Sequence, residues 1–110
     1  MEAKALPACP VETTLSLISD KWKVLIIRDL LPGTKRFGEL KKSLGTVSQK
    51  VLTAQLRQME ASGLLTRTVY PEVPPRVEYS LSELGQSMRP ILDAMETFGL
   101  NYQALVRAGE

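Results

Sequence analysis

The sequence predicts a mostly helical domain of the α+β class with one small β-hairpin. Apolar residues recur at spacings of three and four in four stretches before residue 63, which is the pattern of amphipathic helices. Two runs rich in β-branched and aromatic residues follow, and helical spacing then returns from residue 83 onward. With 110 residues, the chain is expected to form one compact domain with an appended helix.

The four early helices are expected over residues 10–19, 21–31, 36–44 and 49–62. Pro10 suits the first turn of a helix, where no N–H is needed. Ser19-Asp20 and Ser48 carry side-chain oxygens that cap the second and fourth helices. Gly63 fits the left-handed residue that ends a helix.

The hairpin is expected to pair residues 66–70 with residues 76–81. The connection between them, residues 71–75, contains three prolines and is unsuited to a helix. Ser82 then caps a last helix that begins at Glu83, and Pro90 is expected to kink this helix.

The helix after Ser48 is amphipathic. At 100° per residue, Leu56 and Met59 lie within about 40° of Leu52, so these three define the buried side. The opposite side is polar and basic and consists of Lys50, Thr53, Ala54 and Arg57. Residues 35–67 hold seven basic and two acidic residues, whereas the whole chain has a net charge of only +2. Concentrated positive charge is typical of a polyanion-binding surface, although a solvated helical face has the same composition.

Several classes of function are excluded by composition. The chain has no histidine and one cysteine, so Ser-His and Cys-His catalytic pairs and histidine-based metal sites are absent. The acidic residues are scattered, and no glycine-rich phosphate loop is present. We therefore expect no enzyme, no catalytic residue, no metal site and no cofactor. No apolar run reaches the roughly 20 residues of a membrane span, no secretory leader is visible, and a lone cysteine fits the reducing cytoplasm.

Helix, turn, helix and hairpin in this order predict a winged helix-turn-helix with flanking N- and C-terminal dimerisation helices. We expect a loose arm over residues 1–8, a DNA-binding domain over 9–81 and a dimerisation helix over 82–110. The fourth helix can enter the major groove of double-stranded DNA while the hairpin reaches an adjacent groove. The expected DNA-binding residues are Arg36, Lys41, Lys42, Ser48, Gln49, Lys50, Thr53, Arg57, Arg67 and Arg76. Some winged helices bind proteins instead, so a protein-interaction adaptor is the alternative.

A series of short motifs runs along the chain: Cys9-Pro10-Val11-Glu12, Lys21-Trp22-Lys23, Arg36-Phe37 with Glu39-Leu40, Ser48 to Thr53, Gln55 to Arg57, Gly63-Leu64 and Leu84-Gly85. The most specific of them is the run from Arg67 to Tyr79, which includes Tyr70-Pro71 and Pro74-Pro75. In these motifs the sequence resembles the HxlR-type family of bacterial regulators. The resemblance implies a cytoplasmic homodimer that binds a roughly palindromic operator, and we expect repression by blocking polymerase.

The resemblance further implies that the first and last helices form the dimer interface. Spaced apolar residues support this, because the last helix carries more apolar surface than so small a chain can hide. The expected interface residues are Val11, Leu15, Leu84, Met88, Ile91, Met95, Phe98 and Tyr102. Three of these apolar residues could alternatively line an effector pocket, namely Met88, Met95 and Phe98. Several family members sense oxidants or electrophiles through a cysteine at the position of Cys9, where the helix dipole favours an anion; inert packing of the thiol is the alternative.

Overall fold

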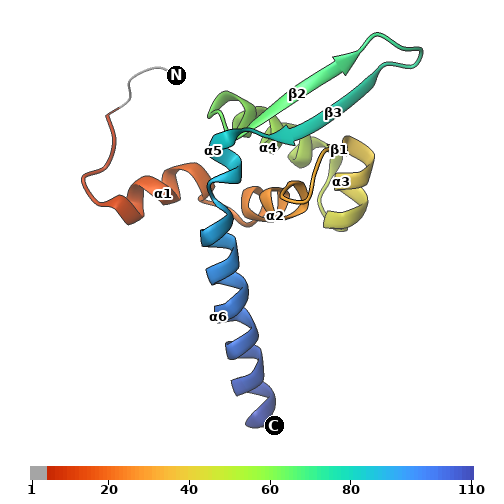
Figure 1. Ribbon diagram of the computed structural model, residues 1–110. Coiled ribbons are helices and arrows are strands. Elements are labelled where there is room, and N and C mark those ends of the chain that lie inside the picture. The colour runs from red at the N-terminus through yellow and green to blue at the C-terminus, as the bar shows by residue number, and fades with distance from the viewer. Residues whose placement is uncertain (1–4) are drawn as a thin grey trace.

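A computed structural model of the protein describes residues 5–110, so the predicted arm over residues 1–8 lies partly outside the described residues. The helices are α1 (Pro10–Ile18), α2 (Lys21–Leu30), α3 (Phe37–Leu44), α4 (Gln49–Ala61), α5 (Glu83–Gln86) and α6 (Arg89–Ala108). The strands are β1 (Lys35–Arg36), β2 (Leu65–Tyr70) and β3 (Arg76–Leu81). As Figure 1 shows, α2, α3 and α4 pack together, while the β2–β3 hairpin and α6 project from this body in different directions.

The three strands form one antiparallel sheet in the order β1-β3-β2. The predicted hairpin is confirmed, with Leu65 opposite Leu81 and Tyr70 opposite Arg76. Strand β1 was not predicted. Its two residues pair with Tyr79 and Glu78 of β3, and the third helix consequently begins at Phe37 rather than at Arg36.

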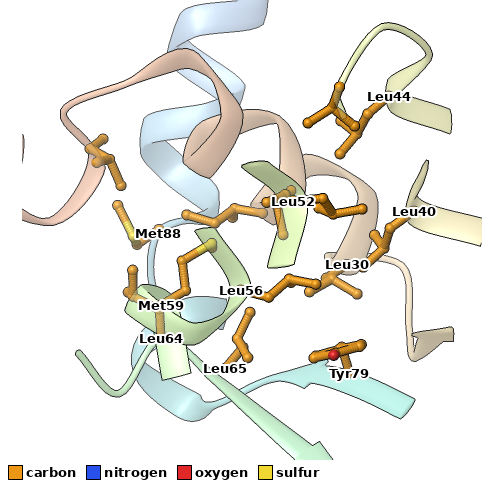
Figure 2. Packing of buried hydrophobic residues seen from close by; sticks show 14 residues of the cluster. Leu30, Leu40, Leu44, Leu52, Leu56, Met59, Leu64, Leu65, Tyr79 and Met88 are labelled. Atoms are coloured by element: carbon orange, nitrogen blue, oxygen red, sulfur yellow. The ribbon is translucent and has the colours of Figure 1, made fainter. Parts of the chain in front are cut away.

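The core lies between the helical body and the base of the sheet (Figure 2). From α4, Leu52, Leu56 and Met59 are buried, as the amphipathic pattern predicts. They meet side chains from every neighbouring element, namely Ile26, Ile27, Leu30, Leu40, Leu44, Val47, Leu64, Leu65 and Tyr79. Helix α4 is therefore held by its apolar side, and its polar side faces away from the core.

The predicted helix caps at Asp20 and Ser48 and the predicted stop at Gly63 are also confirmed. The side chains of Asp20 and Ser48 accept hydrogen bonds from the backbone N–H of Lys23 and Val51, each over 3.1 Å. These bonds satisfy first-turn donors that would otherwise lack partners. Gly63 follows α4 with a φ of +82°, a left-handed conformation that other residues adopt only at a cost.

The prediction of one kinked C-terminal helix from Glu83 is wrong. The chain forms a single-turn α5 and a separate α6, with Ser87 and Met88 between them. Pro90 lies in the first turn of α6, where its missing N–H costs no helical hydrogen bond. The break turns Met88 into the core next to Met59 and Leu64 (Figure 2).

Helix α6 carries apolar side chains that the rest of the protein does not cover. None of its 20 residues is fully buried, and it extends away from the domain like a rod (Figure 1). The radius of gyration is 16.0 Å, whereas a compact chain of this length has about 13 Å. We call the exposed row Met95, Phe98, Tyr102 and Leu105 the α6 stripe; its members are between 49% and 73% exposed.

Candidate nucleic-acid interface

The polar side of α4 is the centre of the candidate site. Gln49, Lys50, Thr53, Ala54 and Arg57 line one shallow hollow on the outside of the helix. Four of these side chains are exposed to solvent, and the fifth, Thr53, is half-buried. Because the opposite side of α4 is fixed in the core, these side chains point to solvent from a rigid base, which favours specific contacts with a partner.

Helix α3 precedes α4 across a short turn, and together they form the helix-turn-helix. Lys42 is exposed. Lys41 is half-buried, and its Nζ donates to the carbonyl oxygen of Val47 in the turn at 3.4 Å. Arg36 is exposed at the start of α3, where its backbone N–H donates to Glu39 Oε1 at 2.9 Å. Lys42 therefore presents positive charge at the end of α3 next to the turn and Arg36 at the opposite end, while Lys41 partly serves to hold the turn.

The wing is the β2–β3 hairpin. Its expected DNA-binding cation, Arg76, already contacts side chains of the same hairpin. The Arg76 guanidinium carbon lies 4.1 Å from the centre of the Tyr70 ring. Its Nε lies 3.0 Å from Glu72 Oε2 and 3.7 Å from Glu78 Oε2. The structure thus places Arg76 in a local cluster with two carboxylates, so a phosphate has to compete with them for this charge. The acidic residues on either side of Arg76 were the one sign of this pairing that sequence reasoning could have used.

Arg67 lies in a more open position on β2. It is exposed, and it lines a pocket of about 260 Å³ between α4 and the sheet together with Thr53, Leu56, Arg57, Glu60 and Tyr79. Arg57 belongs to both this pocket and the outer hollow of α4. The structure therefore brings two of the predicted arginines, one from α4 and one from the wing, to the same junction.

A polar cluster on the flank of α4 was missed by the sequence reasoning. Lys23 Nζ donates to Asp20 Oδ2 at 3.0 Å and to Gln58 Oε1 at 2.8 Å, and Gln55 Nε2 donates to the same Asp20 oxygen at 2.9 Å. Burial raises the pKa of Asp20, but the hydrogen bonds from the Lys23 backbone, the Lys23 side chain and Gln55 outweigh it, so the pKa is lowered overall. One feature of the sequence could have indicated this cluster. Lys23 precedes the buried Ile26 by three residues and therefore lies on the inner side of α2.

The residues expected at a dimer interface divide into two groups. Val11 and Leu15 on α1 are exposed, as are Leu84 and most of the α6 stripe. Met88 is buried inside its own protomer for the reason given above, and Ile91 is half-buried against the core. Met88 therefore offers almost no surface to a partner, which contradicts its expected place in an interface.

Cys9 is the N-cap residue of α1, and its thiol is exposed. It makes no side-chain hydrogen bond to the helix that it precedes. Thr13 instead closes the first turn, through a hydrogen bond from its hydroxyl to the Cys9 carbonyl oxygen at 3.2 Å. The thiol is thus accessible to reagents in solution.

Two kinds of feature are missing from the described part of the chain. Over residues 5–110, no helix is long and apolar enough to cross a membrane. Within the same range, no three cysteine or acidic side chains gather in a way that could hold a metal ion.

Helix-turn-helix, a two-stranded wing and an exposed basic helix define a winged helix-turn-helix protein. The sequence comparison agrees: the HxlR-like helix-turn-helix family model matches residues 17–106, and the chain belongs to this family. The chain is 45% identical to the uncharacterized HTH-type transcriptional regulator YdeP of Bacillus subtilis, over 86% of this chain and 74% of that protein. It is 48% identical to an HTH-type transcriptional regulator of Methanothermobacter thermautotrophicus, over 86% and 72%.

Solved structures agree with these relatives. The crystal structure of the HTH-type regulator YtcD has a TM-score of 0.83 and 47% identity, over 87% of this chain and 98% of that one. The reduced form of the redox regulator HypR has a TM-score of 0.85 and 40% identity, over 91% and 99%. The oxidised form has a TM-score of 0.80 and 44% identity, over 84% and 96%. The protein is therefore a helix-turn-helix transcriptional regulator and not an enzyme.

Proposed function

We propose that the protein binds double-stranded DNA sequence-specifically, as a homodimer on a roughly palindromic operator, and represses transcription by occupying that site. The observation that carries the proposal is the uncovered polar side of α4, from Gln49 to Arg57. This helix is free to enter a major groove, where side chains distinguish all four base pairs. The basic surplus of residues 35–67 favours DNA over a protein partner.

The exposed apolar surfaces of α1 and α6 support the proposed homodimer. A single winged helix covers a short stretch of DNA, whereas two copies related by a two-fold axis read two half-sites about one turn apart. The α6 stripe and the exposed Val11 and Leu15 supply apolar surface for such a contact, and an exposed surface of this kind on a single protomer is typical of an interface.

Regulation by oxidants through Cys9 is the third part of the proposal. HypR is a redox regulator with an oxidised and a reduced form, and the thiol of Cys9 is exposed at the start of α1. The Cys9 thiol forms a disulfide either with the Cys9 thiol of a second protomer or with a small-molecule thiol. In both cases the two thiols together lose two electrons and two protons to the oxidant. A protein of this kind acts in the cytoplasm.

The test starts with selection of bound duplexes from a randomised pool, followed by measurement of Kd for the selected duplex and for a scrambled one. Arg57→Ala is expected to weaken binding to the selected duplex by about 1–3 kcal/mol and to relax specificity at one position. Arg107→Ala is the matched control, because it removes an exposed arginine from the far end of α6.

Two results would overturn the proposal. If the wild-type protein enriches no sequence and its weak binding does not fall steeply with salt, DNA is not the partner and the protein-interaction adaptor is favoured. If DNA is bound but alanine at Lys50, Thr53 and Arg57 leaves the affinity unchanged, α4 does not read the operator.

A further inference from the structure

Lys23 is the one charged side chain that is buried among the residues described, with 9% exposure. Its ammonium group is satisfied by Asp20 and by Gln58, and Asp20 in turn binds Gln55. Removing one partner of a buried charge is costly, because the remaining charge is left without compensation. The four side chains, which we call the α2–α4 clasp, therefore fix one another's positions.

The clasp joins the start of α2 to one flank of α4. Asp20 caps α2, while Gln55 and Gln58 lie one turn apart on α4, between the buried row that includes Leu56 and the outward side that carries Arg57. Burial of leucine and methionine side chains is non-directional, so it fixes which side of α4 is buried without requiring particular bond angles. Hydrogen bonds require defined distances and angles, so the clasp adds a directional restraint on the rotation of α4 to the apolar contacts that hold its buried side.

Resting on the DNA-binding function proposed above, we infer that Lys23 is a positioning residue, which sets the rotation of α4 through Gln58 and thereby its sequence specificity. Side-chain ends lie about 5–6 Å from a helix axis, so a rotation of about 20° moves them by about 2 Å. Base contacts need positions accurate to about 0.5 Å. Contacts of flexible lysines with phosphates tolerate such a shift, and these contacts dominate non-specific binding.

The test compares Lys23→Met with Lys21→Met. Both remove one positive charge from α2, but Lys21 is exposed and its Nζ lies over the Trp22 ring at 4.5 Å, outside the clasp. On a duplex selected by the wild-type protein, Lys23→Met is expected to lose about tenfold in affinity. On a scrambled duplex the affinity of Lys23→Met is expected to equal that of Lys21→Met. Lys21→Met should retain the wild-type ratio of the affinities for the two duplexes.

A second variant separates positioning from simple stabilisation. Gln58→Met removes the hydrogen bond from Lys23 to α4 at an exposed residue and leaves the Gln55–Asp20 bond in place, so the protein is expected to stay folded. Gln58→Met should lower the ratio of the affinities for the selected and the scrambled duplex as Lys23→Met does. The double variant should lower this ratio little more than either single variant, because both substitutions remove the same hydrogen bond.

The inference is overturned if folded Lys23→Met or Gln58→Met keeps the wild-type ratio between the two duplexes. It is also overturned if the ratio of the two affinities falls only in proportion to the melting temperature across these variants, since the role is then stability alone. Failure of the wild-type protein to select any duplex is a different result, because it removes the DNA-binding function on which the inference rests.

Discussion

Phe98 offers the sharpest test of the proposed dimer. It is 73% exposed on the protomer, in the middle of the α6 stripe, and its ring is stacked on that of Tyr102 with the ring centres 6.4 Å apart. Full burial of a phenylalanine side chain contributes about 1.5–3 kcal/mol. Covering the exposed part therefore contributes about 1–2 kcal/mol per protomer and, with two-fold symmetry, about 2–4 kcal/mol per dimer.

Phe98→Glu is expected to remove this contribution and to add the cost of burying a charge. The dissociation constant of the dimer should rise at least roughly 30- to 1,000-fold, and operator binding should fall with it. Because α6 contributes no fully buried residue, the protomer itself is expected to stay folded, with an unchanged helical circular dichroism spectrum.

Sedimentation velocity over a range of concentrations measures the change directly. Ala104→Glu is the control: it places the same charge on the same exposed helix, away from the α6 stripe and with only a small loss of helix propensity. The reasoning is refuted if Phe98→Glu and Ala104→Glu dimerise equally well. It is refuted equally if the wild-type protein is a monomer at micromolar concentration and binds DNA one to one.

Three further predictions concern stability and regulation. A Cβ at Gly85 would lie 2.2 Å from the carbonyl oxygen of Leu64, so urea unfolding should show Gly85→Ala destabilised by about 1–3 kcal/mol; Gly38→Ala, where a Cβ meets nothing within 4 Å, should instead be neutral or more stable. The folded pKa of Asp20 lies below 3.8, so its carboxylate stabilises the protein above about pH 4, and the advantage is lost as the pH falls through the folded pKa. Asp20→Asn keeps the α2 cap, and its deficit in unfolding free energy should therefore be present at pH 7 and shrink as the pH falls below about 4; a constant deficit would show that the charge has no part in it. Cys9→Ser should keep operator binding but lose the response to diamide in a gel-shift assay, and a response that survives would exclude Cys9, since the chain has no other cysteine.

Much of the fold could be predicted because it is encoded locally. The spacing of Leu52, Leu56 and Met59 determined which side of α4 is buried, and hence which side is open to DNA. Capping oxygens at Asp20 and Ser48 marked helix starts, and Gly63 marked a helix end. These features act over a few residues, so they can be read without knowing what packs against them.

Other features depend on residues far apart in the chain, and only the tertiary structure decided them. Two-residue β1 has no periodicity of its own and exists because β3 lies beside it. The C-terminal helix is interrupted at Met88, whose side chain joins Met59 and Leu64 in the buried cluster, and Pro90 then starts a new helix instead of bending an old one.

The same division holds for the candidate site. The sequence determined that basic and polar residues lie on α4 and the wing, because composition and helical spacing are properties of the chain itself. It did not determine that Arg76 is paired with Glu72 and Glu78, nor that Lys23 is joined to Gln58 across 35 positions. Ion pairs and hydrogen bonds form only between groups that folding brings within about 3 Å, and folding does so by burying apolar side chains elsewhere.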